Sequence, residues 1–212
     1  MKMMPLNISR YISPYEACAE VCGNLFRPGL ALDMPLWIDH TKDETTVDQA
    51  RIEAQLDRME LSGRNILHVG IGNSRFAKRF ASRVNLIDGL TVSHNEKVLA
   101  DSQQIAGYTA YFLNKYSRDF LLTIKNRFDF IIDNNLASFA CCKFHFYLML
   151  DNYVWSLRPG GQILTDQQGM DWVIEDQRWK LSYDDLVALS DKFPLQASRV
   201  SDTVFSMQVI KS

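Results

Sequence analysis

The sequence has few cysteines, and their spacing matches no metal-binding pattern. Within the 212 residues the four are Cys18, Cys22, Cys141 and Cys142. No close pair of histidines completes a zinc ligand set around them. We therefore expect no metal site, and we expect the thiols to be small buried side chains of a protein in a reducing compartment.

Long apolar runs and an excess of positive charge are also missing. No eighteen consecutive residues are apolar, which argues against a membrane span, and no apolar run follows Lys2, which argues against a secretory signal. These absences predict a cytoplasmic protein. Lys and Arg total 23 against 25 Asp and Glu, a net charge of −2, whereas proteins that grip a phosphate backbone usually carry a cationic excess. Nucleic acid and membrane are thus disfavoured as partners, and a homodimer is left open.

The first sixty residues differ from the rest of the chain, because they hold four of the six prolines. Residues 14–24 are predicted to form a short helix and 27–45 a loop. A longer helix from about Thr46 carries an apolar stripe. Gly63 lies just past its expected end, where a glycine in the left-handed conformation can cap the helix. We divide the chain into an N-terminal helical and loop cap, 1–60, and an α/β domain, 61–212.

From Asn65 onward strand-like and helical patterns alternate, which predicts a doubly wound, mostly parallel seven-stranded α/β sheet. The predicted strands are Ile66–Val69, Leu86–Val92, Ala110–Leu113, Phe128–Ile132, Gln162–Thr165, Leu195–Val200 and Val204–Ile210. The predicted helices are Arg75–Ser82, Glu96–Ala106, Lys143–Leu157 and Tyr183–Lys192. Only Ser201-Asp202-Thr203 separates the last two strands, so this pair is predicted to be an antiparallel hairpin.

A glycine-rich turn follows the first predicted strand. Gly70 and Gly72 remove side chains where the backbone turns sharply and where a ligand can lie against it, and Asn73 or Ser74 can cap the next helix. A dinucleotide-binding turn has a third glycine where this sequence has Arg75, and an arginine there would crowd a pyrophosphate.

Four segments, in order, resemble the motifs of class I S-adenosylmethionine (SAM)-dependent methyltransferases. They are Ile66–Phe76, Gly89–Glu96, Phe128–Leu136 and Leu157–Leu164. The second is most similar to the Gly-Leu-Thr-Leu-Ser version found in cyclopropane-forming members. The fourth, with Leu157-Arg158-Pro159-Gly160-Gly161, is the most specific, and the resemblance covers about residues 60–212.

The resemblance implies SAM as cofactor and S-adenosylhomocysteine (SAH) as product. It places the glycines against the methionine and ribose portions, and it places Asn114 near the adenine amino group. Thr91, Val92 and Glu96 match contacts to ribose and adenine, with Glu96 best suited to accept hydroxyl hydrogen bonds. Asp133 faces the methionine amino group and the methyl donor. The expected cofactor-binding residues are His68, Gly70, Gly72, Asn73, Ser74, Thr91, Val92, Glu96, Asn114, Asp133 and Asn134.

Two positions depart from the family pattern. His68 stands where the family usually has an acidic residue, and Thr91 stands where it usually has Asp or Glu at the end of the second strand. Asp88 is an alternative ribose ligand if the register is shifted. These departures leave open a domain that binds the cofactor weakly or has lost activity.

Methyl transfer from a sulfonium is an in-line displacement that depends on positioning, and a general base is optional. His145 and Asp133 are the catalytic candidates, with His40 and His94 as further bases. An aromatic acceptor wall is expected from Trp37, Phe139, Tyr147, Met170, Trp172 and Trp179. Since no Asn-Pro-Pro-Tyr-like segment follows the fourth strand, amide and base-amine methylation of the type that uses it is disfavoured.

The sequence thus predicts a SAM-dependent methyltransferase acting on oxygen or nitrogen of a small-molecule acceptor, a metabolite or natural-product intermediate. An RNA- or protein-modifying methyltransferase is one alternative. A non-catalytic Rossmann-like nucleotide-binding module, or a dehydrogenase, is another.

Overall fold

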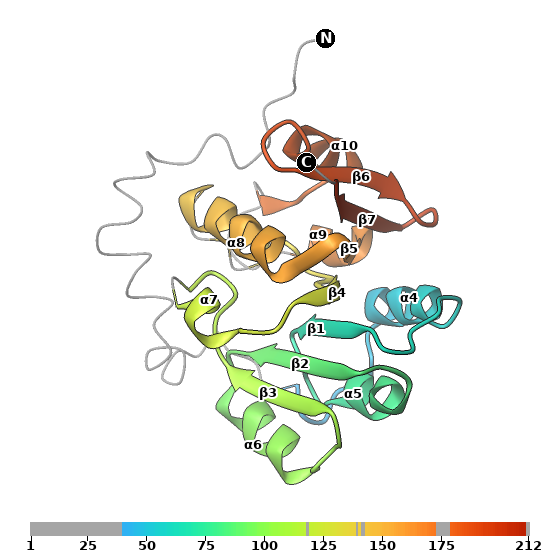
Figure 1. The fold of residues 1–212 in the computed structure, drawn as a ribbon, viewed down its shortest axis with the longest axis vertical. Coiled ribbons are helices and arrows are strands. Elements are labelled where there is room, and N and C mark those ends of the chain that lie inside the picture. The colour runs from blue at the N-terminus through green and yellow to red at the C-terminus, as the bar shows by residue number, and fades with distance from the viewer. Residues whose placement is uncertain (1–39, 118, 139, 141–142, 173–178, 211–212) are drawn as a thin grey trace.

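The fold is built on one twisted sheet, and Figure 1 shows its strands side by side from one edge of the sheet to the other. The computed structural model describes residues 40–117, 119–138, 140, 143–172 and 179–210. Its strands are β1 (Asn65–Val69), β2 (Leu86–Thr91), β3 (Tyr108–Phe112), β4 (Phe128–Ile132), β5 (Leu157–Asp166), β6 (Leu195–Arg199) and β7 (Val204–Val209). Their order is β3-β2-β1-β4-β5-β7-β6. The first five are parallel, and β7 is antiparallel to both β5 and β6. The predicted sheet and its final hairpin are confirmed.

Helices cover both faces of the sheet (Figure 1). They are α4 (Val47–Leu56), α5 (Arg75–Phe80), α6 (His94–Ser102), α7 (Phe120–Thr123), α8 (Lys143–Ser156), α9 (Gln167–Asp171) and α10 (Tyr183–Leu189), with a 3-10 turn, η2 (Ala81–Arg83). α4 and α5 share one apolar cluster, and α7, α8 and α10 share the other. None of the described helices is long and apolar enough to cross a bilayer.

Along each central strand, successive side chains contribute alternately to these two clusters. Ile66 and Ile132 belong to the cluster under α4 and α5, whereas their neighbours Leu67 and Ile131 belong to the cluster under α8. Successive side chains of a strand point to opposite faces, so a strand covered on both sides is apolar throughout. This explains why the central strands show no polar alternation in sequence.

Helix α4 belongs to the same core as the strands. Its Ile52 and Leu56 are fully buried in the cluster that contains Ile66. Arg51 also binds Asp166, at the end of β5, through Nε at 2.9 Å and Nη2 at 2.6 Å. Two parallel N–H···O bonds from one guanidinium to one carboxylate fix the relative orientation of the two groups, in addition to pairing their charges. The proposed boundary at residue 60 stays a prediction, but α4 packs directly on the sheet.

Several boundaries differ from the expected ones. The helix that was expected to run to Gly63 ends at Leu56; Gly63 is left-handed, with φ +72°, but lies in the following turn. Helix α6 begins at His94 because the Ser93 hydroxyl accepts from the Glu96 N–H, at 3.4 Å. The short helices α7 and α9 were not predicted. The expected helix at 14–24, the four cysteines, Trp37 and Phe139 lie outside the described residues.

Candidate functional site

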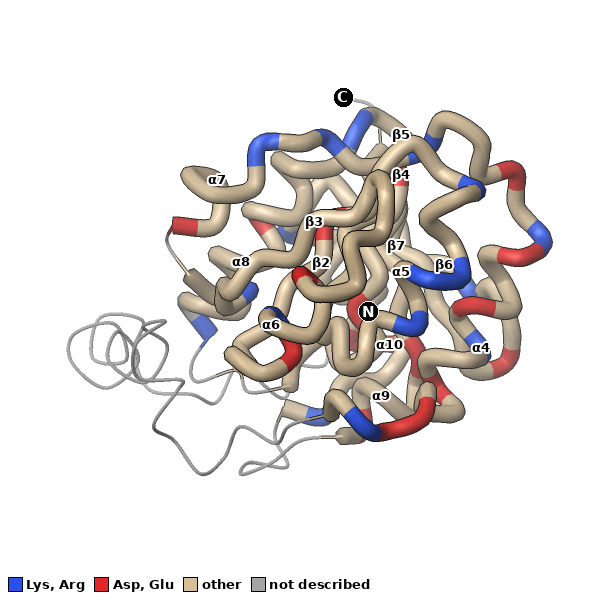
Figure 2. The backbone as a smooth tube through the Cα atoms, turned by 90° about the horizontal axis from the view of Figure 1, so that it is seen from below, with Lys and Arg blue, Asp and Glu red and all other residues tan. Residues whose placement is uncertain are grey.

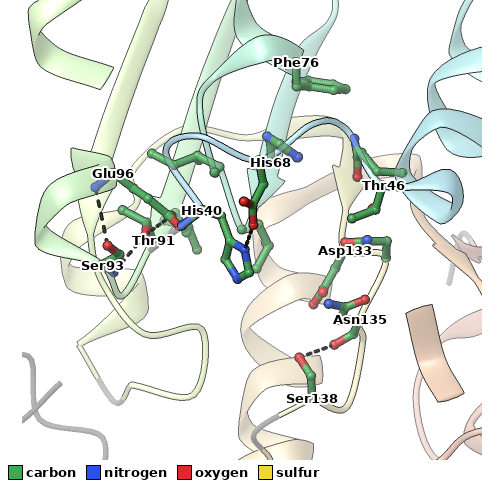
Figure 3. Close-up of a pocket in the computed structure, with 18 of the residues that line it drawn as sticks. His40, Thr46, His68, Phe76, Thr91, Ser93, Glu96, Asp133, Asn135 and Ser138 are labelled. Atoms are coloured by element: carbon green, nitrogen blue, oxygen red, sulfur yellow. Dashed lines mark hydrogen bonds and ion pairs between the residues drawn. The ribbon is translucent and has the colours of Figure 1, made fainter. Parts of the chain in front are cut away.

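A cavity of about 430 Å³ lies where β1 to β4 end (Figure 3). Loops after these strands form its floor, and residues 40–53 form the opposite wall. The strand order reverses beside β1, and in open α/β sheets ligands bind at such a reversal. All expected cofactor-binding residues except Ser74 line this cavity. The crevice predicted at the end of the first strand is therefore present.

The glycine turn forms one end of the cavity. Gly70 and Gly72 have φ values of +80° and +49°, which explains the choice of glycine. Ser74 is the N-cap residue of α5 and makes no side-chain cap hydrogen bond, but the preceding Asn73 accepts from the Arg75 N–H through Oδ1 at 3.0 Å. Ser74 is left-handed and buried, and its hydroxyl lies 3.3 Å from that of Tyr108. Ser74 therefore faces the core instead of the cavity, contrary to its expected role as a direct cofactor contact.

Glu96 and Thr91 form a pair at the end of β2 (Figure 3). The Thr91 hydroxyl donates to Glu96 Oε2 at 2.6 Å, and the backbone N–H of His40 donates to Oε1 at 3.2 Å. Asp88, the alternative ribose ligand, is absent from the cavity lining, and its carboxylate accepts from Asn126 at 2.8 Å. Of the two candidate ribose ligands only Glu96 lines the cavity, and the Thr91 hydroxyl orients its carboxylate. A ribose contact from Glu96 stays a prediction.

Asn114 lies just past β3, where the resemblance places the adenine amino group. It is buried and lines the cavity. Its Oδ1 accepts from the backbone N–H of Tyr116 at 2.9 Å, which fixes the orientation of the amide.

A buried ion pair at the cavity floor was not predicted. Lys115 Nζ lies 2.9 and 3.1 Å from the two carboxylate oxygens of Asp133, and it also donates to the carbonyls of Asn135 and Leu136. Tyr153 donates to the same carboxylate at 2.9 Å. Desolvation lowers the pKa of Lys115, and Asp133 opposes this shift. The position of Lys115 just after a strand, at the same sheet edge as Asp133, was the only signal in the sequence.

His68 is neutral in the folded protein. Its ring stacks on Phe76 with centroids 4.3 Å apart, and burial lowers its pKa to about 3. Nε2 has no hydrogen-bond partner although it is buried, and the residue lines the cavity. An unpartnered buried polar atom is costly, which points to a ligand group as its partner.

The candidate bases separate into two groups. His145 on α8 is buried and His94 packs edge-on against Phe112, and both lie outside the cavity lining. His40 and Asp133 line the cavity. His40 Nδ1 lies 2.6 Å from Asp43 Oδ2, whereas Asp133 is already bound to Lys115. His145 is thus not positioned to act on a ligand in this cavity.

The expected aromatic wall is reduced to one residue among the described ones. Trp172 lines the cavity and is 39 % exposed. Met170, Tyr147 and Trp179 contribute to the core cluster on the α8 side instead.

Residues 40–46 lie over the glycine turn. The Asn73 side chain donates to the carbonyl of Asp43 at 2.5 Å, and Arg75 pairs with Glu44 at 3.5 Å. In Figure 3 His40 lies between the Thr91–Glu96 pair and Asp133. Apart from His40, sequence reasoning did not find the contributions of this segment to the cavity.

No family model and no curated protein matches this sequence. Solved structures do match. The N-methyltransferase NodS from Bradyrhizobium japonicum WM9, in complex with SAH, is 13% identical, with TM-score 0.61 over 82% of this chain and 95% of NodS. An rRNA methylase from Streptococcus thermophilus is 12% identical, with TM-score 0.55 over 79% and 99% of the two chains. CalS10, an amino pentose methyltransferase from Micromonospora echinaspora, is 12% identical, with TM-score 0.54 over 76% and 87%.

These similarities, together with the strand order, show that the chain has the class I SAM-dependent methyltransferase fold. At such identities they establish the fold alone, and the proteins matched differ in what they methylate. The function has to be argued from the cavity itself.

Proposed function

We propose that this chain is a SAM-dependent methyltransferase whose acceptor is a small molecule, methylated on oxygen or nitrogen. The observation that carries the proposal is the composition of one cavity. It combines a glycine turn, a buried carboxylate in the first turn of α6, after β2, and an amide just past β3. These three features suit an amino acid tail, a ribose diol and an adenine.

The residues present fit this cofactor. An added Cβ at Gly70 would meet no atom within 4 Å, so the backbone there is open to a ligand. Glu96 can accept from ribose hydroxyls if they replace the His40 N–H at Oε1. His68 Nε2 offers one further hydrogen bond inside the cavity. The cofactor supplies the electrophilic methyl group, while the chain aligns the reactants and excludes water.

Charge favours a small acceptor over a nucleic acid. The described lining has six carboxylates, from Asp43, Glu44, Asp48, Glu53, Glu96 and Asp133, against two cations, from Arg75 and Lys115. Figure 2 shows acidic and basic positions interspersed along much of the described backbone. A phosphate backbone would be repelled at such a rim. The cavity volume lies in the range of small-molecule sites.

Transfer of a labelled methyl group tests the proposal. The protein is incubated with methyl-labelled SAM and either a small-metabolite extract, total RNA or a protein extract. We expect label in the small-metabolite fraction only, and we expect none with Gly72→Arg, whose side chain would project into the cavity. Label in RNA or protein would contradict the proposed acceptor class, and no transfer to any of them would contradict methyltransferase activity.

A further inference from the structure

The carboxylates of the cavity differ in how their charge is balanced. Four of the six face a basic side chain. These pairs are Asp43 with His40, Glu44 with Arg75, Glu53 with Arg79, and Asp133 with Lys115. Glu96 and Asp48 have no basic side chain within salt-bridge distance among the described residues.

The two remaining carboxylates are not equivalent. Each oxygen of Glu96 accepts a hydrogen bond, one from Thr91 and one from the backbone of His40. Asp48 accepts from Asn134 Nδ2, at 2.6 Å on Oδ2, and no hydrogen bond of the described residues reaches its other oxygen. Arg51, one turn further along α4, directs its guanidinium to Asp166, so its charge acts on Asp48 through space and without a direct hydrogen bond.

Asp48 is nevertheless buried, with 6 % of its surface exposed. Burying a carboxylate is expensive unless a positive group balances it. Its position in the first turn of α4 recovers part of this cost through the helix dipole. The remaining cost is offset if a cationic ligand group completes the site.

A second observation points to a ligand group in the same cavity. His68 Nε2 is buried and unpartnered, and His68 lines the cavity together with Asp48. A neutral imidazole can accept one hydrogen bond from an ammonium group, but it supplies no negative charge. The position of His68 thus lacks the charge that an acidic residue would provide there.

We propose that Asp48 binds the α-ammonium group of SAM and supplies the negative charge that His68 lacks. This inference rests on the proposed function, because it requires SAM or SAH as the ligand. It assigns a cofactor contact to the N-terminal wall of the cavity, and it explains why an acidic side chain is buried there.

Two ligands and one isosteric variant test the assignment. SAH carries the α-ammonium group, whereas 5′-methylthioadenosine keeps the adenosine and the sulfur but lacks the whole amino acid tail. Asp48→Asn retains an oxygen that can accept from Asn134, but it removes the charge. Calorimetric titration should show SAH binding to Asp48→Asn about 10- to 100-fold more weakly than to the wild type. The affinity for 5′-methylthioadenosine should change less than twofold.

The matched control is Glu60→Gln, which removes the same charge from an exposed position outside the cavity lining. It should bind both ligands like the wild type. The unliganded melting temperature of Asp48→Asn should stay within about 3 °C of the wild type, since the loss of the helix-dipole interaction opposes the relief of carboxylate desolvation.

Equal SAH affinities of the wild type and Asp48→Asn would overturn the inference and leave the proposed function intact. Equal weakening of both ligands, with a lowered melting temperature, would also overturn it, because Asp48 would then have a structural role. A wild-type protein that binds no SAH would overturn the proposed function and the inference together.

Discussion

Replacing Lys115 with methionine tests the buried ion pair at the floor of the cavity. The substitution keeps an unbranched side chain of similar length but leaves Asp133 with Tyr153 as its remaining side-chain donor. The side chains of Lys115 and Asp133 are 8% and 2% exposed, so the carboxylate cannot be compensated by water without rearrangement. Removing one partner of a buried pair costs about 3–5 kcal/mol. We expect Lys115→Met to lower the free energy of unfolding by that amount.

The double variant Lys115→Met/Asp133→Asn separates the charge effect from lost packing. An asparagine can accept from Tyr153 without carrying a charge, so the double variant should regain about 2 kcal/mol of the loss.

Urea unfolding followed by circular dichroism measures these free energies of unfolding. A loss below about 1 kcal/mol for Lys115→Met, or a double variant less stable than Lys115→Met, would refute the reasoning that the pair is buried and coupled.

Three further predictions concern two residues of the site, His68 and Glu96, and Gly169, which packs against the cavity-lining Asn134. Lowering the pH from 7 to 5 should cost the wild type about 2 kcal/mol through His68, because its pKa is about 3 when folded and near 6.5 when unfolded, so the unfolded state takes up the proton. His68→Gln should lack that part of the pH dependence in urea unfolding, and an identical pH profile would contradict it. In Gly169→Ala an added Cβ would lie 2.2 Å from the backbone oxygen of Asn134. We expect the free energy of unfolding to fall by about 1–3 kcal/mol and SAH binding to weaken. An unchanged melting temperature would contradict this close packing. Glu96→Gln should weaken SAH binding about tenfold in calorimetry, since a charged acceptor at the ribose position is lost; unchanged affinity would place the ribose elsewhere.

The sheet was predictable because its strands are short apolar runs bounded by turn residues. Alternation of these runs with helices implies parallel pairing, and the three-residue link before Val204 implies the hairpin. The helices α7 and α9 were missed because they have only four and five residues, too few for a helical period to show.

The sequence predicted those residues of the candidate site that are positioned by the ends of strands. Gly70 and Asn114 come just after strands, and Glu96 lies in the first turn of the helix after β2, so their meeting at one sheet edge follows from topology. Lys115 and Asp48 could not be assigned in this way. Their roles depend on which carboxylates the tertiary fold leaves buried and paired, and sequence spacing does not report that. His145 was misplaced because a shift of one or two residues along a helix decides whether a side chain faces the cavity or the core.

Titration of the purified protein with SAH and with NAD tests most directly the claim that this cavity holds SAM. The account predicts one SAH bound per chain, no binding of NAD, and loss of SAH binding in Gly72→Arg, which places a long side chain on a residue with φ +49° that lines the cavity. Binding of NAD by the wild type, or full SAH affinity in Gly72→Arg, would contradict it.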